Sequence, residues 1–593
     1  MTALRYNVLV CCGVTGLSLI ATAAEKVDPL DDRFLPAIAT DEFRCPANVW
    51  VTGSLAKIQP GATPGGLHSA GISAARNEFE SFQVHVRAGA SPIQLNVAVS
   101  DYVNTRTGQR ILANPNVSVF REACLRVSIV SDANGTPGLT PDPLVPARDA
   151  YFHEPRNAFP VTVPPNETRS AWIDVFVPPG TPSGYYLATV TVNDGARVLA
   201  KIPARLKVWD FELPSTATLK SAFGLGYAGL CFAAYGSHDG CGRYPASKGD
   251  AEYGLALMHA AIAAFFLDHR VSIAAVALKP TNPGGMWRQF DTVYGPLLNG
   301  RAKTTLPGAH LTAIDYANGL NLNVDDVRDW MRHFKKMGWL PKLSLSACDE
   351  PPAGCTWSQL LSKANAFHSV APDLPILVTT DIAQATQNGV LDSIDILAPV
   401  VDHVHPRNGA SQRASYNEWL KRPGKELWWY QSCDQHGSCQ NGAPGPKTST
   451  WPSYMVDASP VRNRVFQWMA WLYGIQGELY YATDGWGDHP WDHLHFAGGN
   501  GDGALFYPGT AARIGGKTPI PVASIRLKLI RDGMEDYEYL FALAQAGEAN
   551  LAGEISRSFI TNAWTFNGDP AALTAARERL GWRLHRLAQA KRN

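Results

Sequence analysis

The stretch Leu343-Ser-Leu-Ser-Ala-Cys-Asp-Glu-Pro-Pro352 decides how we interpret the fold. It contains a strand pattern, then two acidic residues, then two prolines that end the strand. Apolar and small polar residues alternate over 342–346, which predicts a short strand. Pro351 cannot continue a strand ladder, so the strand should end at Asp349 and Glu350. A helical pattern follows at 357–369. The stretch therefore predicts one strand–turn–helix unit with two carboxylates at the strand end.

The same unit recurs on both sides of this stretch. Further helices are predicted at 253–267 and 324–336, and further strands at 271–276, 375–379, 394–401, 426–430, 478–481 and 504–507. This alternation predicts a (β/α)8 TIM-like barrel over 218–545, with a doubly wound sheet as the alternative and a helical segment over 546–593. Neither a GxGxxG nor a Walker pattern occurs, so we expect no nucleotide cofactor.

Upstream of the predicted barrel, residues 43–214 follow a different pattern of apolar and polar residues. Short runs alternate apolar and polar residues and are separated by Gly, Pro and Asn, for example at 80–87, 93–99, 172–177 and 186–192. Alternation with a period of two, broken regularly by turn residues, predicts a β-sandwich. Residues 208–214 are its expected closing strand and exit linker.

The first residues predict export. Residues 8–20 are almost entirely apolar, follow a short start with Arg5, and precede the small residues Ala21-Thr22-Ala23. The apolar stretch is too short to span a bilayer, so we predict that residues 1–24 are a cleaved signal peptide. The protein is then expected to be secreted or periplasmic.

Cysteine spacing agrees with an exported protein. Three close pairs each close a short loop: Cys231/Cys241, Cys348/Cys355 and Cys433/Cys439. We expect these to form disulfides, leaving Cys45 and Cys124 as the remaining two. No CxxC or HExxH spacing supports zinc, and the spacing of His403, His405, His489, His493 and His495 matches no ligand set, so no metal is predicted.

Composition excludes several partners. The chain has 52 Lys+Arg and 52 Asp+Glu, without a basic run, which argues against nucleic acid and anionic membranes as partners. It also has 17 Trp and 20 Tyr. Aromatic faces stack on sugars as well as in cores, so this content is compatible with an oligosaccharide, polysaccharide or glycoconjugate substrate.

Barrel enzymes place their catalytic groups at the carboxyl ends of the strands. Besides the acidic pair, the candidates there are expected to bind the substrate: Asp381, Asp402, Trp428, Tyr430, Asp484, Trp486 and Trp491. Carboxylates among aromatic residues are typical of a glycosidase cleft, where an acid protonates the leaving oxygen. Ion pairing for Asp402 and Asp484, and loop packing for the tryptophans, remain alternatives.

Asp349 and Glu350 are the predicted catalytic residues. Neighbouring side chains on a regular strand point to opposite faces, but this constraint is lifted at the end of a strand. Two carboxylates so close repel one another, which favours protonation of one, as a general acid requires. The alternative is a solvated turn before two prolines.

Four motifs together resemble the glycoside hydrolase family 123 group and its uncharacterised relatives. They are the Asp349-Glu350-Pro351 strand end, Gly424-Lys-Glu-Leu-Trp-Trp-Tyr430, Asn500-Gly-Asp-Gly-Ala-Leu-Phe-Tyr-Pro-Gly509, and the run from Ser524 to Leu540. The resemblance covers roughly residues 45 to 545.

The resemblance implies a β-N-acetylgalactosaminidase-like activity with substrate-assisted catalysis, in which the acetamido oxygen of the substrate attacks the anomeric carbon. Glu350 matches the acid/base of the family, and Asp349 matches the residue that orients the acetamido N–H. Tyr430 is the candidate for the tyrosine that contacts the acetamido carbonyl.

Two other functions remain open. In the first, a glycosidase of another specificity uses Glu350 as the acid and Asp484, Asp402 or Asp381 as nucleophile or base. In the second, the protein binds glycans without cleaving them.

Overall fold

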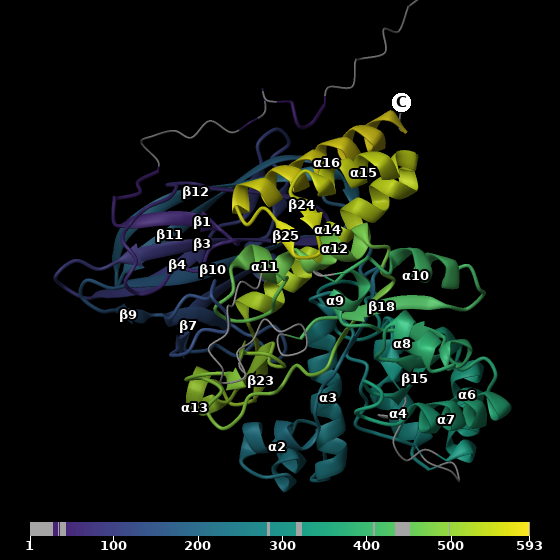
Figure 1. Cartoon of the computed structure of the whole chain (residues 1–593). Helices are drawn as coiled ribbons and strands as arrows, with labels where there is room; N and C mark the ends of the chain where they lie inside the picture. The colour runs from purple at the N-terminus through teal and green to yellow at the C-terminus, as the bar shows by residue number, and fades with distance from the viewer. Residues whose placement is uncertain are drawn as a thin grey trace, which may run out of the picture.

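The computed structural model describes residues 28–591 except for 32, 34, 36–42, 281–284, 316–322, 407–408, 433–450 and 497–498. The predicted signal peptide lies outside this part of the chain. Figure 1 shows strands of the N-terminal half on one side and mixed strands and helices on the other, with helix α14 (Ile525–Leu543) between them.

The N-terminal region is a β-sandwich of two sheets. One sheet has the order β1-β3-β10-β7-β8, and the other β2-β12-β11-β4-β9 with β5 and β6 beside β11. The strands are β1 (Val49–Gly53), β2 (Ala70–Arg76), β3 (Glu78–Arg87), β4 (Ile93–Val99), β5 (Tyr102–Asn104), β6 (Arg110–Ile111), β7 (Val117–Val127), β8 (Gly138–Pro146), β9 (Val161–Val163), β10 (Thr168–Val177), β11 (Gly184–Asp194) and β12 (Arg197–Glu212). A one-turn helix, α1 (Ala113–Asn116), precedes β7. The four predicted strand runs are confirmed.

Strand β10 shows why this region is buried on two faces. Ile173 and Val175 point into the core between the two sheets. Trp172, which directly precedes Ile173, packs on the other face against Ile525 and Leu529 of α14. A period of two therefore serves two apolar environments, one inside the sandwich and one against the rest of the molecule.

The second region contains a nearly closed parallel sheet with the strand order β13-β19-β18-β17-β16-β15-β14. These strands are β13 (Lys220–Phe223), β14 (Ile314–Asp315), β15 (Leu343–Cys348), β16 (Ile376–Val378), β17 (Ile396–Leu397), β18 (Glu426–Tyr430) and β19 (Gly477–Tyr480). All the pairings between them are parallel. The predicted barrel is thus present in the form of a seven-stranded, barrel-like sheet.

Residues 271–276 lie between β13 and β14 but do not form the strand that we predicted. Phe223 N–H donates to Ser272 O at 3.0 Å, and Ala274 N–H donates to Phe223 O at 3.1 Å. On the other side, Asp315 N–H donates to Ala274 O at 3.0 Å. The segment connects the two edge strands through single bridges, because it has too few ladder hydrogen bonds to count as a strand.

Helices separate the strands of this sheet. They are α2 (Ala228–Tyr235), α3 (Ala251–Leu267), α4 (Trp287–Val293), α5 (Gly295–Leu298), α6 (Val324–Met337), α7 (Trp357–Val370), α8 (Ile382–Gln387), α9 (Val401–Val404), α10 (Arg413–Trp419), α11 (Pro460–Arg464) and α12 (Phe466–Leu472). The three predicted helices correspond to α3, α6 and α7, which confirms them.

Two strand predictions need correction. The run 504–507 does not join the barrel sheet; β22 (Phe506–Gly509) pairs antiparallel with β23 (Ile520–Ala523). The run 394–401 contributes only β17, because α9 already begins at Val401.

Three short elements complete this region: β20 (His495–Phe496), β21 (Gly499–Asn500) and α13 (Ala511–Ile514).

Helix α14 joins the two regions through buried ion pairs. Arg531 and Lys528 both contact Asp174 of the sandwich at 2.8 Å. On the opposite side, Arg464 of α11 contacts Asp536 at 2.7 Å. Nearly every side chain of the helix is buried. It lies between two partners rather than on a surface.

The C-terminal segment is helical, as predicted, and returns to the sandwich. It consists of α15 (Ala549–Arg557), the hairpin β24 (Ile560–Asn562) and β25 (Thr565–Phe566), and α16 (Pro570–Ala590). Trp582 of α16 packs edge-on against Trp209 of β12, with ring centroids 5.0 Å apart.

Two of the predicted disulfides are present, Cys231–Cys241 and Cys348–Cys355. Cys433 and Cys439 lie outside the described residues. Cys45 and Cys124 are free thiols, so the leftover pair is not a disulfide. Burial raises the pKa of Cys45 to about 11 and that of Cys124 to about 12.

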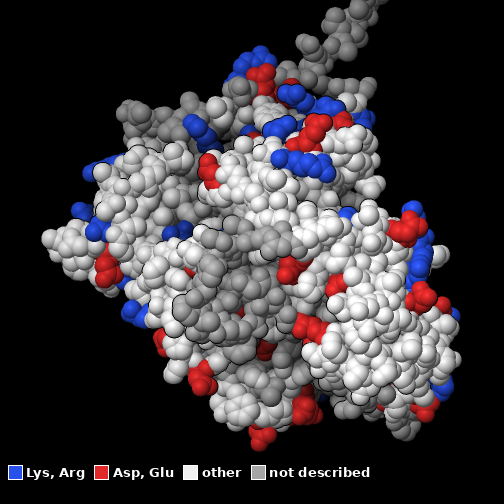
Figure 2. All heavy atoms as spheres, viewed as in Figure 1, with Lys and Arg blue, Asp and Glu red and all other residues white. Residues whose placement is uncertain are grey.

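The surface agrees with the balanced charge of the chain. On the face in Figure 2, blue side chains lie mostly near the outline and are mixed with red ones, and no extended basic patch is visible. None of the helices in the described ranges has the length and apolar character needed to cross a membrane.

Candidate active site

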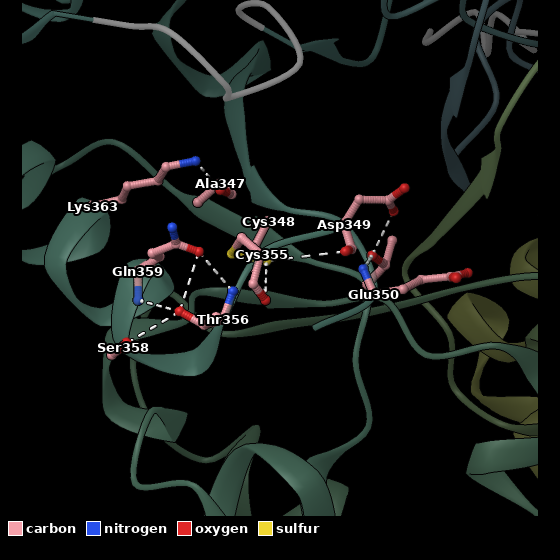
Figure 3. The surroundings of a disulfide bond; sticks show 10 residues. Ala347, Cys348, Asp349, Glu350, Cys355, Thr356, Ser358, Gln359 and Lys363 are labelled. Carbon is pink, nitrogen blue, oxygen red and sulfur yellow. Dashed lines mark hydrogen bonds between the residues drawn. A yellow bond between two sulfur atoms is a disulfide. The ribbon is translucent and has the colours of Figure 1, made fainter. Parts of the chain in front are cut away.

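Asp349 and Glu350 directly follow β15, at the end of the barrel sheet. The turn closes through Gly354 N–H, which donates to Asp349 O at 3.0 Å. A Cβ on Gly354 would lie 2.1 Å from that oxygen, so only glycine permits this closure. Glu350 has φ +42°, in the left-handed region that non-glycine residues rarely adopt. In Figure 3 both acidic side chains extend away from the Cys348–Cys355 disulfide.

Thr379 holds the two acidic residues together from the neighbouring strand. Its Oγ1 accepts a hydrogen bond from Glu350 N–H at 2.6 Å. The same hydroxyl donates to Asp349 Oδ1 at 2.8 Å. One side chain after β16 therefore fixes the carboxylate of Asp349 and the backbone of Glu350 relative to each other.

Tyr430, the last residue of β18, donates its hydroxyl hydrogen bond to Glu350 Oε1. The ring is buried, with 6% of the residue exposed. Burial, followed by the hydrogen bond to Glu350, holds the pKa of Tyr430 well above its usual value. Tyr430 therefore stays a hydrogen-bond donor to this carboxyl group at any physiological pH.

Asp349 lines a cavity of about 370 Å³ at this end of the sheet. Small residues at Ala222 and Ala274, together with Leu377 and Leu479, belong to the barrel interior and also line the cavity. Polar groups around it come from Asp315, Asp349, Thr379, Tyr227, Tyr480 and Tyr481. Its volume lies within the range of about 300–1,000 Å³ that is usual for small-molecule sites.

Asp315, at the end of β14, is a second carboxylate in this cavity. Its Oδ1 accepts a hydrogen bond from Ser346 N–H at 3.0 Å. Burial raises the pKa of Asp315, partly offset by that hydrogen bond and by Lys279. The cavity therefore contains two acids from neighbouring strands, with apolar residues beneath them.

Residues 314–543 match the family model described as the glycoside hydrolase 123 catalytic domain. The match begins in β14 and ends with α14, so it contains the acidic pair and most of the cavity. The chain carries a glycoside hydrolase 123 catalytic domain. The protein is therefore a glycosidase.

A solved structure supports the fold over nearly the whole chain. It is a family 123 glycoside hydrolase from Clostridium perfringens, described in a study of glycolipid glycan hydrolysis, with a TM-score of 0.65 and 15% identity. The match covers 91% of this chain and 98% of that one. A family 39 glycoside hydrolase from Bacteroides cellulosilyticus WH2 aligns with a TM-score of 0.29 and 11% identity, over 78% of this chain and 81% of that one, which is too low to carry an argument. None of the curated proteins compared with the chain matches it.

Two other predicted acids, Asp381 and Asp402, follow the next two strands of the barrel sheet, β16 and β17. Asp381 caps α8, where its Oδ1 accepts from Ala383 N–H at 2.9 Å and Gln384 N–H at 3.0 Å. Its Oδ2 lies 3.5 Å from His403 Nδ1. Asp402 is half-buried in α9, burial raises its pKa, and its Oδ1 has no hydrogen-bond partner among the described residues.

Asp484, Trp486 and Trp491 meet at a separate hollow of about 520 Å³. Asp484 Oδ1 accepts from Gly226 N–H at 2.9 Å, and burial raises the pKa of Asp484. Trp486 is 8% exposed and donates through Nε1 to Phe506 O at 2.6 Å. These three predicted residues are thus grouped together, beside the cavity rather than around the acidic pair.

Trp428 lies inside the barrel sheet, below the cavity. It is 2% exposed and donates through Nε1 to Glu426 Oε2 at 2.8 Å. A Cβ on Gly477 would lie 2.3 Å from its ring, so only glycine at this position of the neighbouring strand leaves room for the indole. Trp429 faces the other way and stacks on Phe466 with centroids 4.7 Å apart. Trp428 fills the lower barrel interior, which the alanines above it leave open.

Among the described residues, no cluster of three or more His, Cys, Asp or Glu side chains is arranged to hold a metal ion. His405 instead contacts the hydroxyl of Tyr473 through Nδ1 at 2.6 Å.

Thr379 and Asp315 are the site residues that sequence reasoning missed. Thr379 ends the predicted strand 375–379, but a hydroxyl at a strand end carries no chemical signature. Asp315 ends a strand of only two residues, Ile314–Asp315, which is too short to show a period. Its position one strand before the acidic pair was the signal available.

Proposed function

We propose that the protein is an exported glycosidase that cleaves β-linked 2-acetamido-2-deoxy-hexosides of the N-acetylgalactosamine type with retention of configuration. The observation that carries this proposal is the unit of Asp349, Thr379 and Glu350. Thr379 ties the two carboxylic residues together at a cavity wall. Adjacent acids cannot flank a sugar ring from opposite faces, as acid and nucleophile do in the usual retaining mechanism. They suit a reaction whose nucleophile belongs to the substrate.

In the proposed mechanism Glu350 protonates the glycosidic oxygen as the bond to the anomeric carbon breaks. The acetamido oxygen of the same sugar attacks that carbon and forms a cyclic oxazolinium, while Asp349 accepts the acetamido N–H. Glu350, now ionised, takes a proton from the incoming water. The water oxygen bonds to the anomeric carbon and the acetamido group is restored, so Glu350 ends protonated again.

Tyr430 supports Glu350 in this scheme. Its hydroxyl contacts Glu350 Oε1, and the buried ring keeps that contact in one orientation. We assign Tyr430 the role of holding the acid/base, with transfer of its hydrogen bond to the acetamido carbonyl when substrate is bound.

A second candidate function follows from Asp315. This acid lines the same cavity as Asp349, one strand away. It could serve as the nucleophile or base of a glycosidase acting on sugars without an acetamido group, with Glu350 as the acid. Among the barrel carboxylates, Asp381 is less suited to this role because it caps α8.

A panel of aryl β-glycosides with and without a 2-acetamido group distinguishes the two functions. We expect turnover only of the acetamido sugars, inhibition by a thiazoline analogue of the oxazolinium, and loss of activity in Glu350→Gln. Glu418→Gln, on the exposed surface of α10, is the matched control. Full turnover of sugars without the acetamido group would refute substrate assistance, and its loss in Asp315→Asn would support the second function.

We add two proposals, one on the barrel architecture and one on export. Residues 271–276 take the eighth position of a (β/α)8 barrel, supported by their hydrogen bonds to Phe223 and Asp315. Residues 1–24 direct export, which is consistent with the two disulfides.

A further inference from the structure

The hollow of about 520 Å³ beside the cavity is lined by aromatic rings and polar groups. The aromatic residues are Phe232, Trp486 and Trp491, and the polar ones include Asp488, His489 and Arg513. Phe232 is 56% exposed, so its ring is accessible to a ligand. Flat apolar faces with polar groups at the rim suit a sugar, which presents C–H faces and hydroxyl edges.

The rings of the hollow are held in fixed orientations. Trp491 donates through Nε1 to Pro508 O at 3.0 Å, and its ring lies against Tyr507 with centroids 5.4 Å apart. Trp486 is held in the same way by Phe506 O at 2.6 Å. Phe232 stands on α2, next to the Cys231–Cys241 disulfide. Binding therefore requires little ordering of these side chains, which lowers its entropic cost.

Two short chain segments, 222–233 and 479–491, contribute lining residues to both the cavity and the hollow. Gly224 and Tyr481 line the cavity, and Asp484, three residues after Tyr481, lines the hollow. Gly226 N–H donates to Asp484 Oδ1 at 2.9 Å, which joins the two segments. The two segments thus lead from residues that line the cavity to residues that line the hollow.

We propose that this hollow, which we call the aromatic hollow, binds further sugar residues of the same glycan whose terminal sugar is cleaved in the cavity. The proposal rests on the proposed function and adds to it a binding site for the sugar next to the cleaved bond. Asp488, His489 and Arg513 supply donors and acceptors for hydroxyl groups at the rim.

The test compares two substrates that share the cleaved sugar. One is the 4-nitrophenyl β-glycoside of N-acetylgalactosamine, and the other is a trisaccharide in which the same sugar is β-linked to lactose. The variants are Phe232→Ala and Trp491→Ala. Leu67→Ala is the control, because Leu67 is a similarly exposed apolar residue, 64% exposed, on the sandwich. Phe232→Ala removes an exposed ring and keeps the fold even if Trp491→Ala does not.

We expect kcat/KM for the trisaccharide to fall about tenfold in Phe232→Ala and to stay within about twofold for the aryl glycoside. Equal losses on both substrates, or no loss on the trisaccharide, would overturn the aromatic hollow as a sugar site. Calorimetric titration of the trisaccharide into Glu350→Gln, with and without Phe232→Ala, tests binding apart from turnover. Weaker binding after loss of Phe232 supports the hollow even if the aryl glycoside is not hydrolysed, and unchanged binding contradicts it.

Discussion

The hydroxyl of Tyr430 donates a hydrogen bond to Oε1 of Glu350 across two strands of the barrel sheet, from a position 80 residues later in the chain. The contact orients the proposed acid/base without adding a charge beside it. It also gives the tyrosine a role that is separable from its packing, because phenylalanine preserves the ring and removes only the donor.

We therefore expect Tyr430→Phe to lower kcat by about 10- to 100-fold on aryl acetamido-glycosides. The variant loses the donor that orients Glu350 in the free enzyme and the acetamido carbonyl in the complex. KM should change by less than about threefold. Tyr454→Phe is the matched control, because Tyr454 donates to buried Glu478 at 2.5 Å outside the cavity. Steady-state kinetics of both variants provide the measurement. If Tyr454→Phe lowers kcat as much, the effect of Tyr430 is on folding and not on the acid/base.

Thr379 offers a second test of the same unit. Thr379→Val keeps the shape but removes both hydrogen bonds, to Asp349 Oδ1 and from Glu350 N–H. We expect kcat to fall more than about tenfold, because a displacement of about 1 Å at the reacting groups can cost up to about 100-fold. Thr379→Ser keeps the hydroxyl and should restore most of the activity. Equal activity of the valine and serine variants would show that the bridge does not position the pair.

The sequence was sufficient for the strand end that carries the pair. Pro351 breaks the ladder, and the alternation before it predicts β15, so the position of Asp349 and Glu350 follows from local rules. The contacts made by Thr379 and Tyr430 do not follow from local rules, because they depend on which strands are neighbours in the sheet. The pairing of β15 with β16, and the approach of Tyr430 to Glu350, exist only in the folded barrel.

The errors have a similar origin. The apolar run at 504–507 has the same composition whether it joins a parallel barrel or an antiparallel hairpin, and only tertiary pairing with β23 decides between them. Helix α14 carries many charged residues, and charged side chains on most helices face solvent. In the structure those charges are buried, because the sandwich and α11 supply partners such as Asp174 and Arg464.

The disulfide beside the acidic pair should affect activity, whereas the other disulfide should affect only stability. Cys348–Cys355 and Cys231–Cys241 close loops of similar size, with sequence separations of 7 and 10. Replacing either pair with serine should therefore cost a similar amount, about 2–3 kcal/mol. Only the Cys348→Ser/Cys355→Ser variant releases the turn that holds Asp349.

We expect that variant to lose at least about tenfold in kcat on an aryl glycoside, while Cys231→Ser/Cys241→Ser keeps its kcat. Thermal unfolding checks that the two variants lose comparable stability. The same kcat in both variants would show that hydrogen bonds alone, without the disulfide, position the acidic pair.

Glu122, in β7, predicts a dependence of stability on pH that has nothing to do with catalysis. Its side chain is buried, and neither carboxyl oxygen has a hydrogen-bond partner among the described residues. Burial raises its pKa to about 8. The folded state therefore keeps a proton that the unfolded state releases above about pH 4.3.

The contribution of this group is fully present below the unfolded pKa and is lost as the pH rises toward the folded pKa of about 8. Between these values the wild type should lose about 1.4 kcal/mol of unfolding free energy per pH unit from this group. Glu122→Gln removes the titration, so its unfolding free energy should fall less steeply between pH 5 and pH 8. Urea unfolding at several pH values gives the two slopes, and Glu418→Gln on the exposed face of α10 should keep the wild-type slope. Parallel slopes for wild type and Glu122→Gln would mean that Glu122 is already ionised in the folded protein, stabilised by a partner or by water that reaches the carboxylate.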